Sequence, residues 1–168
     1  QNEAKKLENR LKKDHILDES SKSIYFSSWV FPAIRILCDI SHFNSASEIA
    51  ERLQMPKNHV MKCLDFLIKN DIVIQKNNTL SIGPAHIYLP ATDPLATRDH
   101  VNWRQLAFQK MQISNEDNFF YSGNYALSKV VAHEIRMMLP DLIEGVLKKV
   151  KPSLSETTCC LNIDYFEF

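Results

Sequence analysis

Six histidines and four cysteines are the residues of this 168-residue chain that could bind a metal or act in catalysis. His133-Glu134 begins like the HExxH helix of zinc proteases, but Met137 stands where the second histidine ligand would be. No CxxC pair occurs, so we expect free thiols in a reducing environment. No serine has the glycine-flanked elbow of a hydrolase, and no glycine-rich phosphate loop is present. The sequence therefore predicts a protein that is not an enzyme and binds neither a metal nor an organic cofactor.

Basic and amide side chains that could contact DNA gather at two places in the middle of the chain. The first is the start of a predicted helix at Pro56, where lysine can contact phosphate or guanine and asparagine can read adenine. The second is a predicted turn at residues 76–78, whose side chains would touch the phosphate backbone. The residues that we expect to contact DNA are Lys57, Asn58, His59, Lys62, Lys76, Asn77 and Asn78.

Three predicted helices and a hairpin would position these residues. Apolar residues recur at helical spacing over 25–41, 46–54 and 56–70, and we expect Ser47 to cap the second helix. The predicted core faces are Trp29, Pro32, Ala33, Ile36, Leu37 and Ile40 on the first helix, and Val60, Cys63, Leu64, Leu67 and Ile68 on the third. Residues 72–75 and 79–82 have the pattern of strands, joined by Asn77-Asn78, which tolerate left-handed backbone conformations. This order is typical of a winged helix-turn-helix module, predicted over residues 25–92.

The chain on either side of this module has a different pattern. Residues 1–24 are polar, with Ala4, Leu7 and Leu11 at helical spacing, and predict a leading helix or linker from an upstream region. Residues 93–168 predict a small α/β domain. Its expected elements are a helix over 95–113 with Val101, Leu106, Phe108 and Met111 buried, an aromatic strand over 118–127, a helix over 129–150 interrupted at Pro140, and an alternating strand over 157–168. The expected fold class is therefore α+β, a winged helix-turn-helix followed by a small α/β layer.

Three segments of the chain resemble the bacterial DUF4423 family. They are YFSSWVFPAIRIL, AERLQMPKNHVMKCLDFLIKNDIV and the closing LNIDYFEF, and the resemblance spans nearly the whole chain. It implies an upstream helical region and a regulatory role, and it brings no catalytic residues with it.

The charge balance leaves two functions open. Twenty basic and twenty acidic residues cancel, and residues 25–92 carry six Lys and Arg against five Asp and Glu, a net charge of +1. Proteins that contact several phosphates usually have a more basic face. One prediction is a bacterial transcriptional regulator that binds DNA through the module. The other is a protein-interaction or homodimerisation module in a signalling pathway, in which the aromatic segments 119–121 and 165–168 form the interface. The alternative for these aromatic side chains is that they fill the core of the C-terminal layer. No apolar run approaches the roughly 20 residues of a membrane span, so we expect a cytoplasmic protein without a membrane partner.

Overall fold

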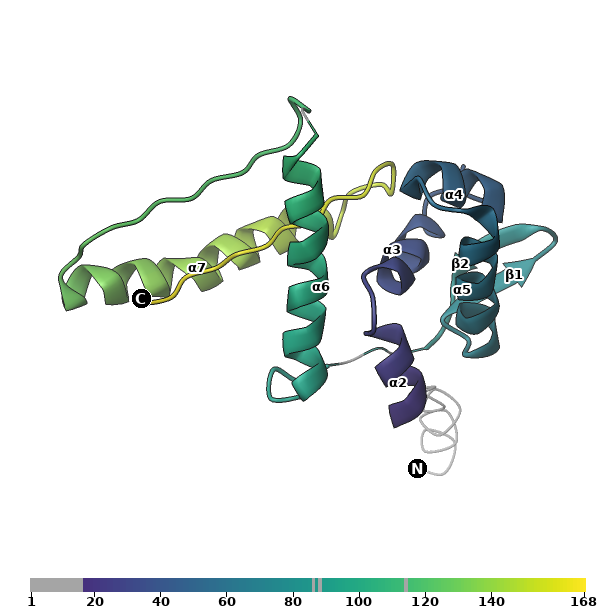
Figure 1. The fold of residues 1–168 in the computed structure, drawn as a ribbon, viewed down its shortest axis with the longest axis horizontal. Helices are drawn as coiled ribbons and strands as arrows, with labels where there is room; N and C mark the ends of the chain where they lie inside the picture. Colours follow the sequence, from purple (N-terminus) through teal and green to yellow (C-terminus); the bar gives the residue numbers. More distant parts are fainter. Residues whose placement is uncertain (1–16, 86, 88, 114) are drawn as a thin grey trace, which may run out of the picture.

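Six helices and one two-stranded sheet make up the part of the chain that this computed structural model describes, residues 17–168 without 86, 88 and 114 (Figure 1). The elements are α2 (Glu19–Tyr25), α3 (Val30–Leu37), α4 (Ala46–Leu53), α5 (Lys57–Lys69), β1 (Val73–Lys76), β2 (Thr79–Ile82), α6 (Pro94–Met111) and α7 (Lys129–Val150). The fold is α+β, as the sequence predicts. Figure 1 shows α2 to α5 and the hairpin grouped together, α6 beside them, and α7 extending away on the opposite side.

The hydrophobic core lies between α3, α4, α5 and the hairpin. Its largest fully buried side chains are Ile34, Leu37, Ile49, Val60, Leu67, Ile72 and Val73. The stripe predicted on α5 is confirmed, because Val60, Cys63, Leu64 and Leu67 are buried and Ile68 packs against the core. On α3 the prediction was partly wrong: Ile36 is 42% exposed, and Val30 and Ile34 are buried in its place.

Side chains at the helix starts fix where most of the helices begin. Asp18 accepts a hydrogen bond from the Ser21 N–H at 2.8 Å and begins α2. Ser45 and Glu48 form a capping box at α4, so the cap is Ser45 and the prediction of Ser47 was wrong. Asp93 caps α6 by accepting a hydrogen bond from the Leu95 N–H, and Ser128 caps α7 by accepting one from the Val131 N–H.

The hairpin follows α5 directly and has the turn that its sequence predicts. β1 and β2 pair antiparallel, with Val73 opposite Ile82 and Lys76 opposite Thr79. Asn77 and Asn78 both have left-handed backbone, with φ of 49° and 60°. Two such residues make the tight turn that matches the twist of a hairpin.

Helix α2 contributes to the same core. Leu17, Ser21 and Tyr25 are buried, and the Ser21 hydroxyl donates a hydrogen bond to Asn70 Oδ1 at 2.9 Å. Helix α6 is attached here too, since the buried Asn102 amide donates to the Phe26 carbonyl at 2.9 Å. Residues 1–16 of the predicted leading helix lie outside the described residues.

The predicted α/β layer after the hairpin is wrong for the described residues. The helix over 129–150 is present, although Pro140 lies inside it without dividing it. Residues 118–127 and 157–168 are extended chain without strand pairing, and the hairpin is the only sheet in the described part of the chain. A strand requires a neighbour's N–H and C=O groups, and Figure 1 shows that residues 112–128 arch from α6 to the start of α7 while the tail runs back along α7. The predicted burial of Val101, Phe108 and Met111 is also wrong, because all three are exposed.

Replacing Gly83 by alanine should destabilise the core. A Cβ atom at Gly83 would collide with the Asp71 carbonyl, where the Gly83 N–H donates to Ile72 O at 2.9 Å and the Ala85 N–H to Asp71 O at 3.2 Å. Because the obstacle is backbone, we expect Gly83→Ala to lower the free energy of unfolding by about 1–3 kcal/mol. Urea denaturation followed by tryptophan fluorescence measures it, since Trp29 packs against the core and Trp103 lies in the cleft beside α6.

Gly145→Ala is the matched control. A Cβ atom at this position in α7 meets no other atom within 4 Å, and alanine favours helix over glycine by about 1 kcal/mol. Equal destabilisation by the two substitutions would contradict the close approach at Gly83.

Candidate nucleic-acid interface

The chain between α4 and α5 turns sharply and sets the direction of α5. Gln54 ends α4 with left-handed backbone, φ 53°, and the Met55 N–H returns to Ala50 O at 2.9 Å. Pro56 comes next, and its fixed φ and missing N–H suit the residue that precedes a helix. The two helices are therefore joined by three residues, with Leu53 and Met55 packed against the core.

The first two turns of α5 carry four of the predicted site residues. Lys57, Asn58, His59 and Lys62 are all exposed, while Val60, which directly follows His59, is fully buried. No side chain caps this helix end. The His59 N–H donates to Pro56 O at 2.9 Å, whereas the N–H groups of Lys57 and Asn58 precede the first acceptor of the helix and carry the positive end of its dipole. This helix end thus offers backbone donors and two lysine charges to an anion.

His59 differs from its neighbours because it has a partner within the chain. Its Nε2 lies 3.8 Å from the sulfur of Cys63, one turn further along α5. Burial raises the pKa of the Cys63 thiol, so this sulfur stays protonated at neutral pH. The contact holds the imidazole along the helix and makes His59 less free than Lys57 or Lys62 to reach outward.

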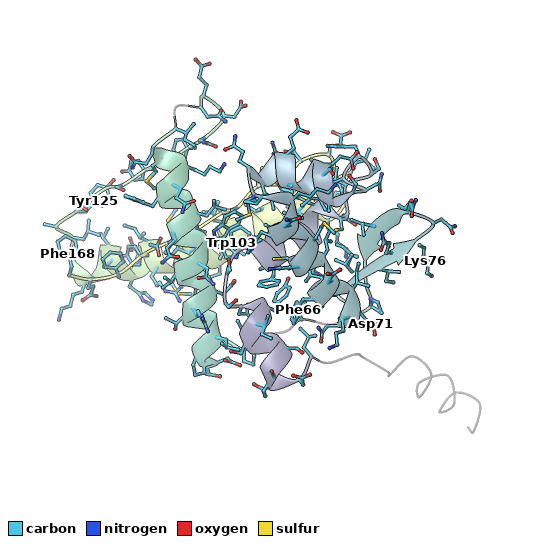
Figure 2. All side chains as sticks on the ribbon, turned by 45° about the vertical axis from the view of Figure 1, so that its right-hand side comes forward. Phe66, Asp71, Lys76, Trp103, Tyr125 and Phe168 are labelled. Atoms are coloured by element: carbon cyan, nitrogen blue, oxygen red, sulfur yellow. The ribbon has the colours of Figure 1, made fainter. Side chains whose placement is uncertain are left out.

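The other three predicted residues lie at the hairpin turn. Lys76, Asn77 and Asn78 are exposed, and Figure 2 shows Lys76 at the outer end of the hairpin, away from Phe66 in the core. The Phe66 ring packs edge-on against Phe31, with centroids 5.2 Å apart, and helps to hold α5 against α3. The seven residues therefore form two exposed groups on elements of one core, the first turns of α5 and the hairpin turn.

The acidic residues near the start of α5 differ in how strongly they would repel an anion, because, within the described part of the chain, some of their carboxylates are hydrogen-bonded and others are not. Glu48 accepts hydrogen bonds from the N–H groups of Asn44 and Ser45, both at 2.9 Å, and from the Ser45 hydroxyl. These bonds, the hydroxyl first, hold the pKa of Glu48 below its ordinary value. Asp65 is exposed on α5 beyond Lys62. The positive group at the start of α5 is thus followed by a negative charge on the same helix.

A second group of polar side chains lines a cleft of about 490 Å³ between α2, α3 and α6, and the sequence analysis missed it. Arg35, Asp99, His100 and Trp103 lie there among apolar residues. Arg35 Nε is buried without a hydrogen-bond acceptor. Burial raises the pKa of Asp99, with His100 and Trp103 opposing the shift. Asp99, His100 and Trp103 are close together on α6, but Arg35 lies more than 60 residues earlier, on α3, so only the packing of α6 brings them beside it.

Neither a metal centre nor a membrane span is found in the described part of the chain. Within that part, His, Cys, Asp and Glu side chains nowhere gather in threes in a way that could hold a metal ion. None of its helices has an apolar stretch of the length needed to cross a bilayer.

The chain matches the family model "Domain of unknown function (DUF4423)" over residues 8–168. It therefore belongs to this family, as the three sequence segments indicated. Comparison with curated proteins gives no match, and comparison with solved structures gives none. The function must therefore be argued from the chain's own residues.

Replacing Glu48 by glutamine should change how stability depends on pH. The pKa of Glu48 is lowered in the folded protein. The Glu48 carboxylate therefore stabilises the folded protein at pH values above its pKa in the unfolded chain, and this stabilisation is lost as pH falls through the pKa in the folded protein. We expect Glu48→Gln to be less stable than the wild type at pH 7. Urea denaturation between pH 3 and pH 7 should show a smaller loss of stability on acidification for the variant.

Asp99→Asn should change stability at pH 7 in the opposite direction. The pKa of Asp99 is raised, so its ionisation destabilises the folded protein as pH rises from its unfolded pKa through the folded one. Asp99→Asn should be more stable than the wild type at pH 7, and the advantage should shrink on acidification. Parallel pH profiles for both variants would contradict these assignments.

Proposed function

We propose that this protein is a regulator that binds DNA, and that α3, α4, α5 and the hairpin form a winged helix-turn-helix module. The support is the order of these elements and the three-residue link between α4 and α5. In such modules the second helix of the pair enters the major groove by its first turns, and the hairpin contacts the backbone. Fold alone does not define function, because many winged helices bind proteins.

The observation that carries the proposal is the exposure of all seven predicted residues at these two places. Lys57, Asn58 and Lys62 lie off the buried stripe of α5, beside a helix end without a side-chain cap. Backbone N–H groups and lysine charge at such an end bind phosphate. Asn58 can also donate to and accept from an adenine edge. Lys76 and Asn78 would contact phosphates from the hairpin turn.

The small positive charge of the module sets the expected strength of binding. Residues 25–92 have a net charge of +1, and affinity for DNA rises with the number of neutralised phosphates. We therefore expect weak binding by a single module. Two linked modules would bind more tightly, because the second contact becomes intramolecular.

A protein-interaction role is the second candidate, and one observation favours it. The aromatic side chains of 119–121 and 165–168, which the sequence analysis offered as an interface, are exposed. They lie far from the hairpin turn: Figure 2 shows Tyr125 and Phe168 at the opposite end of the molecule from Lys76. The two functions therefore use different surfaces and do not compete.

Replacing Lys57, Lys62 and Lys76 together by alanine tests the DNA proposal. Each lysine that contacts a phosphate contributes about one unit to the slope of log affinity against log salt concentration. We expect the triple variant to bind a mixed-sequence duplex more weakly and with a slope smaller by about three units. Fluorescence anisotropy of a labelled duplex across a salt series measures both quantities. An Asn58→Ala variant should instead change the preference among duplex sequences.

The control is Lys110, Lys149 and Lys151 replaced together by alanine. These exposed lysines lie on α6 and at the end of α7, and their loss changes the net charge by the same amount. This variant should keep the wild-type salt slope. If both triple variants lose affinity equally, only the overall charge matters and the proposed surface is wrong.

A further inference from the structure

The part of the chain after residue 114 contains no buried residue. This C-terminal arm comprises residues 115–168, that is, α7 and the extended chain on either side of it. Helix α7 is 22 residues long and buries none of them. Its exposed large apolar side chains are Val130, Val131, Met137, Met138, Leu142, Ile143, Leu147 and Val150. Helices in proteins owe most of their stability to a packed apolar face, and α7 is only partly packed within this chain, through the half-buried Ala132, Ile135, Leu139 and Val146.

The extended segments beside α7 are equally apolar and equally uncovered. Phe119 is 87% exposed, Phe166 73% and Phe168 96%. Polar contacts hold the tail in place: Arg104 Nε donates to Asp164 at 2.7 Å, and the Tyr165 hydroxyl donates to Ala132 O at 2.8 Å. Ser155 also donates to the Asp39 carboxylate. The arm is therefore positioned against α6 and α3 while its apolar side chains face outward.

The exposed area measures how much surface is left without a partner. The chain exposes 13410 Å². A compact monomer of 19.4 kDa exposes about 8,500 Å². Residues 1–16 could account for at most about 2,700 Å² of the difference, the surface of a fully extended segment of that length. At least about 2,200 Å² per chain therefore remains uncovered, or about 4,400 Å² for two chains, within the range that obligate homodimers bury.

We propose that two copies of this chain form a dimer through their C-terminal arms, each arm covering the apolar side chains of the other. Residues 118–127 and 157–168 have a strand-like pattern and no strand partner in the described chain. A two-fold pair supplies four such segments and two copies of α7, so that unpaired backbone groups of one copy meet those of the other. The groove between α7 and the tail is lined by Leu139, Ile143, Leu147, Ile163 and Tyr165, with Arg136 and Glu144 also in its lining, and offers space for side chains of the second copy.

The charges of α7 fit a second copy better than a membrane surface. Lys129, Arg136, Lys148 and Lys149 alternate along the helix with Glu134, Asp141 and Glu144. The helix is thus nearly neutral, and the whole chain has zero net charge, so no like-charge repulsion opposes self-association. Helices that lie on anionic membranes instead have a strongly basic polar face. The dimer does not depend on the DNA proposal, although it would place two modules in one particle.

Sedimentation equilibrium of the full chain tests the dimer. We expect twice the chain mass at micromolar concentrations, and a thermal unfolding midpoint of the helical signal that rises with protein concentration. Leu142→Glu places a charge in the proposed interface and should raise the dissociation constant by about 100-fold. Ile24→Glu is the matched control, because Ile24 is 43% exposed on α2, outside the arm, and should leave the dimer unchanged.

Tryptophan fluorescence keeps the test decisive if the arm of the variant loses its helix. Both tryptophans lie outside the arm, Trp29 against the core and Trp103 in the cleft beside α6, so a native emission spectrum shows that the rest of the Leu142→Glu variant is folded. A wild-type chain that stays monomeric at 100 µM would overturn the proposal. Binding of that monomer to anionic phospholipid vesicles would show that the arm covers its apolar side chains with a membrane and not with a second copy. Retention of the wild-type dissociation constant by Leu142→Glu would overturn it as well.

Discussion

The packing of α3 and α4 against α5 is the interaction on which the rest of the structure depends. Ile34, Ile49 and Leu67 come from these three helices and are completely buried in one core. Because this core fixes α5 on one side, the opposite side of the same helix must face solvent, and its first turns present Lys57 and Lys62. The same core includes Ile72 and Val73, which hold the hairpin at its base and leave Lys76 at its outer end.

The part of the structure that depends on local patterns could be predicted from the sequence. The stripe from Val60 to Leu67 specifies a helix of one orientation, and Asn77-Asn78 specifies a tight turn, since both signals act over a few residues. The candidate site followed from these elements, because a helix start and a turn are local features. Ile36 was misassigned because every residue of α3 except Arg35 is apolar, so the pattern alone does not single out the face that packs against the core. Ser47 was misassigned because two serines precede the same apolar run, and only Ser45 has Glu48 at the spacing of a capping box.

The remaining errors concern features that depend on contacts between distant residues. An alternating segment such as 157–168 indicates a strand, but the sequence does not say which chain provides its neighbour. The predicted burial of Phe108 and Met111 likewise assumed a partner within the chain, whereas both are exposed. The cleft around Arg35 and Asp99 was missed because it exists only where α6 packs against α3. In each case the missing information is a tertiary or intermolecular contact rather than a local preference.

Amide hydrogen exchange of the full chain, with and without a mixed-sequence DNA duplex at low salt, tests the central claim most directly. The claim is that one rigid core presents the start of α5 and the hairpin turn to DNA, while the C-terminal arm serves another partner. The account predicts that the duplex slows exchange at residues 57–62 and 76–78 and leaves exchange in α7 unchanged. Protection by DNA confined to α7 and the extended segments beside it, with residues 57–62 and 76–78 unaffected, would contradict it.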